Sequence, residues 1–310
     1  MIKILFVGST NLSRAVLEKL IELKLCDVKG ILSNSKKFQI SYSQSLVTNF
    51  NFANLSEIAE SNSISFYNLN SGMNEEKLQD WIESLEIEII LVIGWYHMIP
   101  KNLLDKYLCV AVHASLLPNY RGGAPLVWAV INGEKLTGVT LFKMNEEVDS
   151  GPIIFQEKFS ISESDTIRDL QLKAESGTLT LVDRFFRSFP KIELMPQSNL
   201  EQSLVYKQRN PLDGRINFFD NAGHLYNFIR AQTKPYPGAF LQVEAIFLMI
   251  WSSQVIDLKM NLTNVGKLVQ DSKSLLLICA QGSLKLNDFE IKNSGAKLPI
   301  DEFVSLWNKS

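Results

Sequence analysis

Short apolar runs separated by helical patterns dominate the first part of the chain and restrict its fold more than any other feature. They lie at residues 2–7, 28–32, 87–93 and 107–112, and they are nearly continuous rather than alternating. Runs of this kind are typical of strands in a parallel sheet that is buried on both faces. Between the first two runs, apolar residues recur at helical spacing over residues 12–21. This strand–helix–strand opening predicts an α/β fold with a Rossmann-like, mostly parallel sheet.

The turn after the first run contains a single glycine, Gly8, which Ser9 follows. The dinucleotide-binding pattern G-x-G-x-x-G is therefore absent. An anionic ligand could still bind here, because the free N–H groups at the start of a helix favour negative charge. Ser9 is thus a candidate substrate contact, and an ordinary β–α turn explains the same residues equally well.

The helical and strand periodicity changes after residue 188, which indicates a second domain. Residues 188–204 lose periodicity and include Pro190 and Pro196. Short β-type runs follow at residues 240–243, 246–252, 265–269, 275–279 and 284–291. Such runs are typical of a small barrel or sandwich. We expect an α/β domain at residues 1–189, a linker at 190–204 and a smaller β-rich domain at 205–310.

Composition excludes several classes of protein. The apolar share of 46% and the charged share of 21% are those of a soluble globular protein. The net charge of −2 gives no overall positive field that would attract nucleic acid. Cys26, Cys109 and Cys279 lack the spacing of a disulfide framework or a metal site. Because no apolar run approaches the roughly 20 residues of a membrane span, and the N-terminus does not resemble a signal peptide, we expect a cytoplasmic protein without metal.

The stretch of residues 110–151 contains a candidate acid–base pair. An apolar run ends at His113, a loop rich in proline and glycine follows, and a β-like run at residues 138–144 leads to Asp149. A carboxylate can orient an imidazole and stabilise its charged form. The two side chains can meet only if two strand ends are neighbours, as an α/β sheet allows. A surface histidine and a turn aspartate are the alternative.

Two further loops contain candidate ligand contacts. Residues 33–54 form a long polar loop in which Lys36 and Tyr42 could meet a phosphorylated ligand or simply face solvent. The aromatic loop at residues 94–100 follows the strongest strand, and ligands of parallel sheets bind at the carboxyl ends of the strands. This loop could flank a flat heterocycle or cover the core beside the next helix.

Several motifs occur together and in a fixed order along the chain. They are His113-Ala-Ser-Leu-Leu-Pro118, Tyr120-Arg-Gly122, Pro125, Gly138-Val-Thr140, Asp149-Ser-Gly151 and, later, Lys234-Pro-Tyr-Pro-Gly-Ala-Phe240. This set resembles the signature of the formyltransferases that use 10-formyltetrahydrofolate, and the resemblance covers the whole chain. The family includes methionyl-tRNA formyltransferase, glycinamide ribonucleotide transformylase and the sugar N-formyltransferases. One HxSLLP motif would be weak support, whereas the ordered set is specific.

The resemblance implies roles for individual residues in the attack of an acceptor amine on the formyl carbon carried by the folate. His113 would stabilise the developing oxyanion or shuttle a proton, and Asp149 would orient His113 and help to take a proton from the amine. The residues that would bind folate, partly through main chain, are Gly94, Tyr96, Met98, Ile99, Glu146, Val148 and Asp149. The residues that would contact the acceptor are Ser9, Lys36, Tyr42, Tyr120, Arg121, Gly122, Gly123, Arg209 and Arg215.

Ala111 departs from the family pattern, which usually has an asparagine two residues before the histidine. That asparagine would donate a hydrogen bond to the formyl oxygen, and a methyl group cannot. Three accounts are open: a branch that works with His113 and Asp149 alone, an engineered substitution, or a protein that binds its ligands without turnover. We favour the first account.

The choice of acceptor depends on charge and on the loop sequences. An RNA substrate favours a basic insertion and a positively charged second domain, whereas the loop at residues 33–54 is mostly Ser, Asn, Phe and Tyr. The segments GWYHMIP and GGAPLVWAVING also resemble the sugar-nucleotide branch. We therefore expect N-formylation of an amino sugar on a nucleoside diphosphate. Arg209 and Arg215 would face its phosphates, and a solvated charge cluster is the alternative for these two side chains. The alternative functions are a methionyl-tRNA formyltransferase and a folate- or nucleotide-binding protein.

The apolar β-runs near the C-terminus fit either the edge of a homodimer or an internally closed barrel.

Overall fold

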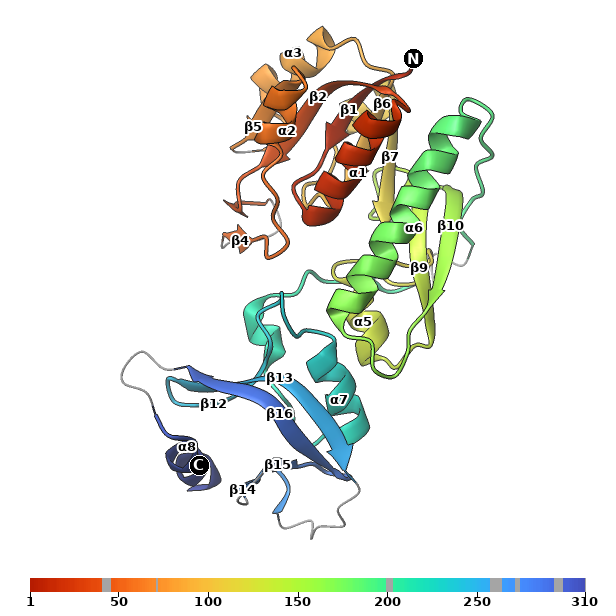
Figure 1. Cartoon of the computed structure of the whole chain (residues 1–310). Helices are drawn as coiled ribbons and strands as arrows, with labels where there is room; N and C mark the ends of the chain where they lie inside the picture. Colours follow the sequence, from red (N-terminus) through yellow and green to blue (C-terminus); the bar gives the residue numbers. More distant parts are fainter. Residues whose placement is uncertain are drawn as a thin grey trace. The chain divides into compact units, whose positions relative to one another are not determined.

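Seven strands form the main sheet, in the order β10-β9-β7-β6-β1-β2-β5 (Figure 1). Their bounds are Lys3–Val7 (β1), Asp27–Asn34 (β2), Ser65–Leu69 (β5), Ile89–Ile93 (β6), Leu108–His113 (β7), Leu136–Lys143 (β9) and Ile153–Ser160 (β10). All pairings from β5 through β2, β1 and β6 to β7 are parallel, whereas β7 and β9 are antiparallel. The predicted Rossmann-like, mostly parallel sheet is confirmed.

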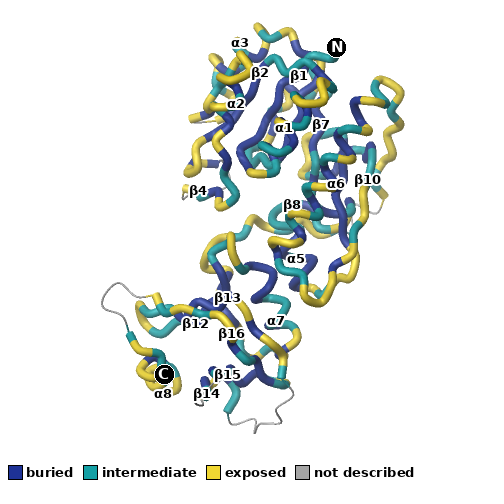
Figure 2. The backbone as a smooth tube through the Cα atoms, viewed as in Figure 1, coloured by how far each residue is buried: buried dark blue, intermediate teal, exposed yellow. Residues whose placement is uncertain are grey.

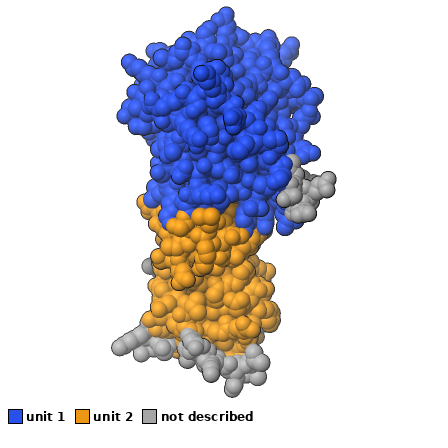
Figure 3. Space-filling view, turned by 90° about the vertical axis from the view of Figure 1, so that its right-hand side faces the viewer, with its two compact units in different colours: residues 1–122, 137–159, 172–206 blue, residues 123–136, 160–171, 207–310 orange. Residues whose placement is uncertain are grey.

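The computed structural model describes residues 1–40, 46–70, 72–198, 203–256, 264–270, 274–292 and 298–309. They divide into two compact units (Figure 3). Unit 1 contains residues 1–122, 137–159 and 172–206, and unit 2 contains residues 123–136, 160–171 and 207–310. Two short segments, residues 123–136 and 160–171, thus group with the C-terminal part. The division of the chain into domains at residues 1–189 and 205–310, with a linker at 190–204, stays a prediction.

The order in which strands are added to the sheet reverses between β1 and β6, and this reversal marks where a ligand can bind. From β1 the chain continues outward to β2 and β5, and from β6 it continues the other way to β7 and β9. Helix α1 (Asn11–Leu23) begins here with a reciprocal cap between Thr10 and Ser13. The Ser13 hydroxyl also donates to the carbonyl of Ile93 at 2.6 Å, which ties the start of α1 to the end of β6. Ligands of open α/β sheets bind at the carboxyl ends of the strands beside such a reversal.

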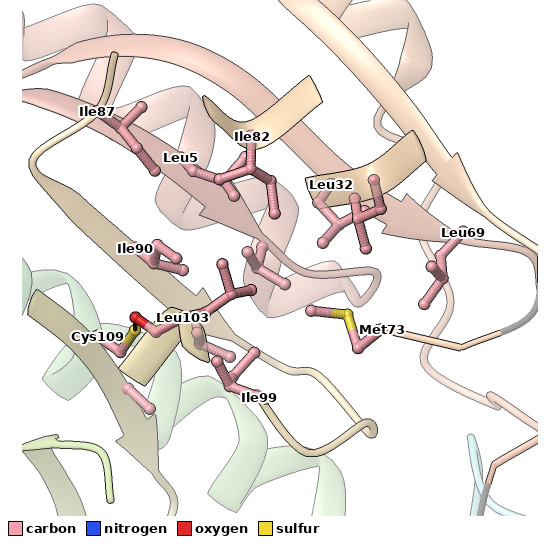
Figure 4. Close-up of a cluster of buried hydrophobic side chains, with 14 of the residues drawn as sticks. Leu5, Leu32, Leu69, Met73, Ile82, Ile87, Ile90, Ile99, Leu103 and Cys109 are labelled. Atoms are coloured by element: carbon pink, nitrogen blue, oxygen red, sulfur yellow. Dashed lines mark hydrogen bonds between the residues drawn. The ribbon is translucent and has the colours of Figure 1, made fainter. Parts of the chain in front are cut away.

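Helices α2 (Ser56–Ser61), α3 (Glu76–Ser84), α4 (Lys101–Lys106) and α6 (Ile167–Ser188) complete the helical layer of unit 1. Ile82 of α3 and Leu103 of α4 meet Leu5 of β1 and Ile90 of β6 in one buried cluster (Figure 4). Figure 2 shows the strands of this sheet mostly in the colour of buried residues. The apolar runs that predicted the strands are therefore the core of unit 1.

The three cysteines are free and buried, as their apolar surroundings in the sequence indicated. Burial raises the pKa of the Cys109 thiol to about 12, so the group is a protonated core residue at neutral pH. The Cys109 thiol lies within 3.6 Å of the carbonyl of Leu103. None of the described helices is both long enough and apolar enough to cross a membrane.

Unit 2 contains a five-stranded antiparallel sheet in the order β12-β13-β16-β15-β14. Its strands are Ala239–Val243 (β12), Ile246–Ile256 (β13), Leu268–Gln270 (β14), Leu275–Ile278 (β15) and Ser283–Lys292 (β16). Helices α5 (Pro125–Ile131), α7 (Ala222–Arg230) and α8 (Ile300–Lys309) belong to the same unit. The predicted β-rich domain is confirmed. Its apolar face packs on Leu225 and Ile229 of α7 and Phe303 of α8, so helices rather than a second sheet cover it.

Candidate active site

His113 is the last residue of β7 and lies at the carboxyl end of the main sheet. Its side chain is 10% exposed, and each ring nitrogen faces an oxygen acceptor. Nε2 lies 2.7 Å from the carbonyl oxygen of Tyr120, and Nδ1 lies 3.4 Å from Oδ2 of Asp149. A carbonyl oxygen can only accept a hydrogen bond, so Nε2 is the nitrogen that donates to Tyr120, while the Asp149 carboxylate faces the other ring nitrogen.

Asp149 lies in the turn between β9 and β10 and adopts a left-handed backbone conformation with φ +49°. Aspartate tolerates this region better than most residues, yet it remains strained relative to extended backbone. Its Oδ2 accepts a hydrogen bond from the main-chain N–H of Gly122 at 2.8 Å. One carboxylate oxygen thus joins the β9–β10 turn to the loop after His113 and faces the imidazole.

The loop of residues 118–122 supports the pair from the other side. Tyr120 and Gly122 both have positive φ, +58° and +88°. A Cβ at Gly122 would lie 2.3 Å from the carbonyl oxygen of Tyr206, so no other residue fits there without movement. Arg121 is buried, and its Nε donates to the carbonyl of Val148 at 2.8 Å. Of the four predicted acceptor contacts in this loop, Tyr120, Arg121 and Gly122 lie beside the pair, whereas Gly123 belongs to unit 2.

The aromatic loop at residues 94–100 follows β6, the strand next to β7. Gly94 has φ +61°, and a Cβ there would clash with the Thr10 hydroxyl at 2.1 Å. Tyr96 and His97 both lie 5.3 Å from the ring of Phe38, measured between centroids. Burial lowers the pKa of His97, which keeps this ring neutral at pH 7.

The predicted folate contacts differ in exposure. Met98 is 43% exposed and Val148 is 36% exposed, whereas Ile99 is buried in the core. Glu146 is exposed and forms an ion pair with Lys101 at the start of α4. The carbonyl of Val148 is the acceptor for Arg121, so that main-chain oxygen already has a partner. Among the predicted folate contacts, the side chains of Met98 and Val148 expose apolar surface to solvent.

Ala111 lies two residues before His113 on β7, so both side chains are on the same face of the sheet. It is 6% exposed and belongs to the apolar core cluster, with Phe142 of β9 as its cross-strand partner. The alanine methyl group therefore fills core space next to the imidazole. An asparagine here would have to place its amide between an apolar cluster and the His113 ring.

Replacing Ala111 by asparagine should not raise the rate of formyl transfer, and it should lower the free energy of unfolding by about 1–3 kcal/mol, because a polar amide would enter an apolar cluster. Urea denaturation of the purified variant checks the stability, and turnover of the formyl donor checks the rate. A rise in rate of tenfold or more would show that the missing donor limits the natural protein.

The remaining predicted contacts are Ser9, Lys36, Tyr42, Arg209 and Arg215. Ser9 is fully buried, and its carbonyl accepts from the Asn49 amide at 3.0 Å. Lys36 lines a pocket of about 350 Å³ with residues of the β2 and β5 ends. Tyr42 lies outside the described residues. Arg209 and Arg215 line a pocket of unit 2.

Asn49 is a residue that the sequence alone did not indicate. Its amide donates to Ser9, and its Oδ1 accepts from the Tyr96 hydroxyl at 3.3 Å. It thus connects the turn before α1 with the aromatic loop after β6. A lone asparagine in a polar loop carries no pattern that distinguishes it from its neighbours.

The fold and site thus combine a mostly parallel α/β sheet, a histidine at the end of β7 that faces an aspartate in the β9–β10 turn, and a following β-rich domain. Residues 2–180 match the formyl transferase family model, and residues 209–305 match the model of the formyl transferase C-terminal domain. The chain belongs to the formyl transferase family, and the predicted resemblance and formyl-transfer activity are confirmed.

Relatives of two kinds are similar to this chain. The methionyl-tRNA formyltransferase of Caldanaerobacter subterraneus subsp. tengcongensis is 26% identical over 306 residues, which cover 97% of this chain and 96% of that protein. The methionyl-tRNA formyltransferase of Thermodesulfovibrio yellowstonii is 30% identical over 236 residues, 75% of each chain. An N-formyltransferase from Helicobacter canadensis, crystallised with folinic acid and dTDP-3-aminofucose, superposes with a TM-score of 0.68 at 21% identity, covering 93% of this chain and 100% of that chain. The sugar 3N-formyl transferase WlaRD gives a TM-score of 0.67 at 20% identity, covering 93% and 99%.

Proposed function

We propose that this chain transfers a formyl group from 10-formyltetrahydrofolate to the amine of a nucleotide-linked amino sugar. The acid–base chemistry rests on one observation: His113 and Asp149 face each other at 3.4 Å at the carboxyl end of the sheet. The formyl donor rests on family membership and on neighbours that were crystallised with folinic acid or 5-N-formyl-THF.

The residues after β6 and β9 fit a flat, partly apolar donor. Met98 and Val148 expose apolar surface, and Trp95 buries an indole N–H that has no hydrogen-bond partner among the described residues. When bound, 10-formyltetrahydrofolate supplies the formyl carbon. Gly94, Tyr96, Met98, Ile99 and the main chain of the turn at residues 146–149 would hold it.

The chain's own residues supply the proton transfers and the charge stabilisation. An amine that becomes an amide must lose a proton. We assign the acceptance of this proton to Oδ2 of Asp149, the oxygen that also faces the imidazole. The Nε2–H of His113, which donates to the Tyr120 carbonyl in this structure, would turn toward the negative charge that develops on the formyl oxygen. With Ala111 in place of the family asparagine, His113 carries this stabilisation without help from that position.

The acceptor site that we propose is the pocket of unit 2, with a volume of about 580 Å³. Its charged lining consists of Lys207, Arg209, Arg215, His224, Asp213 and Asp220, and its aromatic residues are Trp128 and Phe228. The Arg209 guanidinium lies 4.8 Å from the ring centroid of Trp128 and 5.8 Å from that of Phe228. Bases stack on aromatic rings and phosphates attract arginine, so this lining suits a nucleoside diphosphate.

Charge argues against an RNA acceptor as the first choice. Residues 205–310 carry twelve lysines and arginines against nine aspartates and glutamates, a net charge of only +3. Contacts with several phosphates of an RNA would call for a denser basic surface. A methionyl-tRNA formyltransferase is nevertheless the second candidate, because a relative of that name is 26% identical over 97% of this chain.

The direct test is to incubate the protein with 10-formyltetrahydrofolate and a panel of amino-sugar nucleotides, and separately with charged initiator tRNA. Release of tetrahydrofolate with a sugar nucleotide supports the proposal. Release with the charged tRNA alone supports the second candidate, and donor binding without release in any mixture supports a binding protein.

Replacing Arg215 by alanine should weaken the binding of UDP or dTDP about tenfold, because one charge-assisted contact to a phosphate is lost. Calorimetric titration measures the dissociation constant. Lys267→Ala is the matched control, since Lys267 is an exposed cation of unit 2 outside the pocket lining. Equal dissociation constants for the Arg215 variant and the wild type would remove Arg215 from the proposed site.

A further inference from the structure

The segment after α6, predicted as a linker, contacts the turn that carries Asp149. Met195 and Ile153 exchange backbone hydrogen bonds, each 2.8 Å between N and O. Two residues further, the Gln197 amide nitrogen donates to two carbonyls, that of Asp149 at 2.9 Å and that of Gly151 at 2.7 Å. The two hydrogens of the Gln197 amide group therefore bind the carbonyls of the residues immediately before and after Ser150.

The same segment continues to the loop that follows His113. The Ser203 hydroxyl donates to the carbonyl of Pro118. Val205–Tyr206 (β11) pairs in parallel with Arg121–Gly122 (β8), and the ring of Tyr206 stacks on that of Tyr120 at 5.3 Å. The described residues 195–198 and 203–206 thus join the two loops whose ends meet at the His113–Asp149 pair.

The backbone of Asp149 needs such support. A left-handed aspartate is held only where its surroundings fix it, and a turn of this kind can relax to an ordinary φ. Relaxation would rotate the carboxylate away from Nδ1 of His113 and from the Gly122 N–H. Gln197 fixes the carbonyl of Asp149 itself, so its amide acts on the torsions that direct the carboxylate. The Gln197 Oε1 is buried without a hydrogen-bond partner among the described residues, so the donated hydrogen bonds are what the side chain contributes.

We propose that Gln197 is a positioning residue for formyl transfer, whose amide holds Asp149 in the left-handed conformation that aims its carboxylate at His113. This inference rests on the proposed role of Asp149. A small misplacement of a catalytic group is costly, with about 10²-fold for a shift near 1 Å. The expected loss on removal of the amide is therefore large, although Gln197 touches neither substrate.

The test compares Gln197→Met, which keeps the length of the side chain and removes both donors, with Gln197→Lys, which restores N–H donors. For Gln197→Met we expect kcat to fall about 10- to 100-fold with unchanged KM for donor and acceptor, and for Gln197→Lys we expect most of the rate to return. In an Asp149→Ala background, Gln197→Met should change the residual rate less than twofold, because the group that it positions is gone. Additive losses in the two backgrounds would overturn the proposal and indicate a merely structural role.

A second readout needs no acceptor. The chain has three histidines, so the ¹⁵N spectrum of its imidazoles is simple and His113 can be assigned by its own substitution. The His113 ring signals should move in Gln197→Met in the same direction as in Asp149→Ala. They should stay in place in Gln79→Met, whose amide donates to the carbonyl of Met73 at 2.9 Å far along the chain from the pair. Unmoved His113 signals in Gln197→Met would contradict the proposal. Full activity of Asp149→Ala would instead contradict the proposed role of Asp149, and absence of formyl transfer by the wild type would contradict the proposed function.

Discussion

Replacing His113 by alanine should lower the rate of formyl transfer by about 10²- to 10⁴-fold, the contribution of one positioned acid–base group. The two ring nitrogens face the Tyr120 carbonyl and the Asp149 carboxylate at 2.7 and 3.4 Å. In the proposed mechanism, loss of the ring removes both the stabilisation of the formyl oxygen and the route for the proton. Single-turnover measurement of tetrahydrofolate release at pH 7.5 gives the rate without interference from product release.

A His113→Gln variant separates the two roles of the ring. Glutamine keeps an N–H donor near the position of Nε2 but cannot transfer a proton. If hydrogen-bond donation is the main effect, this variant retains far more activity than the alanine variant. If proton transfer is the main effect, the two variants are equally slow. A near-wild-type rate for His113→Ala would remove the histidine from the mechanism altogether.

Replacing Asp149 by alanine should be about as damaging, with a loss of about 10²- to 10⁴-fold. The carboxylate is 20% exposed, lies 3.4 Å from Nδ1 of His113 and accepts the N–H of Gly122 at 2.8 Å. Without it the imidazole loses the group that faces Nδ1, and the loop after β7 loses its hydrogen bond to the β9–β10 turn. Asp149→Asn, which keeps the size and tolerates the same backbone region, should lose nearly as much because the charge is gone.

Glu147 supplies the matched control for the aspartate. Its side chain is 75% exposed and lies 3.9 Å from Arg121, so it is an acidic neighbour in the same turn without a contact to His113. Solvent screens the exposed Glu147 carboxylate and its 3.9 Å pair with Arg121 is long, so Glu147→Gln should change the rate less than twofold. If the Glu147 and Asp149 variants lost the same activity, the turn as a whole rather than the Asp149 carboxylate would be responsible.

Much of unit 1 could be predicted because its strands and helices carry local patterns. The run at residues 2–7 forms β1 at Lys3–Val7, and the run at residues 87–93 forms β6 at Ile89–Ile93. Continuous apolar runs mark strands buried on both faces, and that signal is contained in a few consecutive residues. The position of His113 at a strand end follows from the same pattern, since the apolar run stops there.

Features that depend on contacts far apart in the sequence were not predictable in this way. Residues 123–136 and 160–171 group with the C-terminal part, yet their local patterns are those of the first part. Gln197 was part of a stretch without periodicity, and its two hydrogen bonds to the turn of Asp149 are specific to one side chain. Helix α8 did carry a signal, since Phe303, Val304 and Trp307 recur at helical spacing and pack against the unit 2 core.

The most direct test follows the formyl carbon itself. The wild-type protein and Asp149→Ala are incubated with 10-formyltetrahydrofolate labelled with ¹³C in the formyl group and with a panel of nucleotide-linked amino sugars, and the products are examined by NMR. The proposed function predicts the label as an N-formyl amide on the sugar amine with the wild type, and the same signal forming about 10²- to 10⁴-fold more slowly with Asp149→Ala. Label that appears only in free formate, or only on the methionine of initiator tRNA in a parallel mixture, would contradict it.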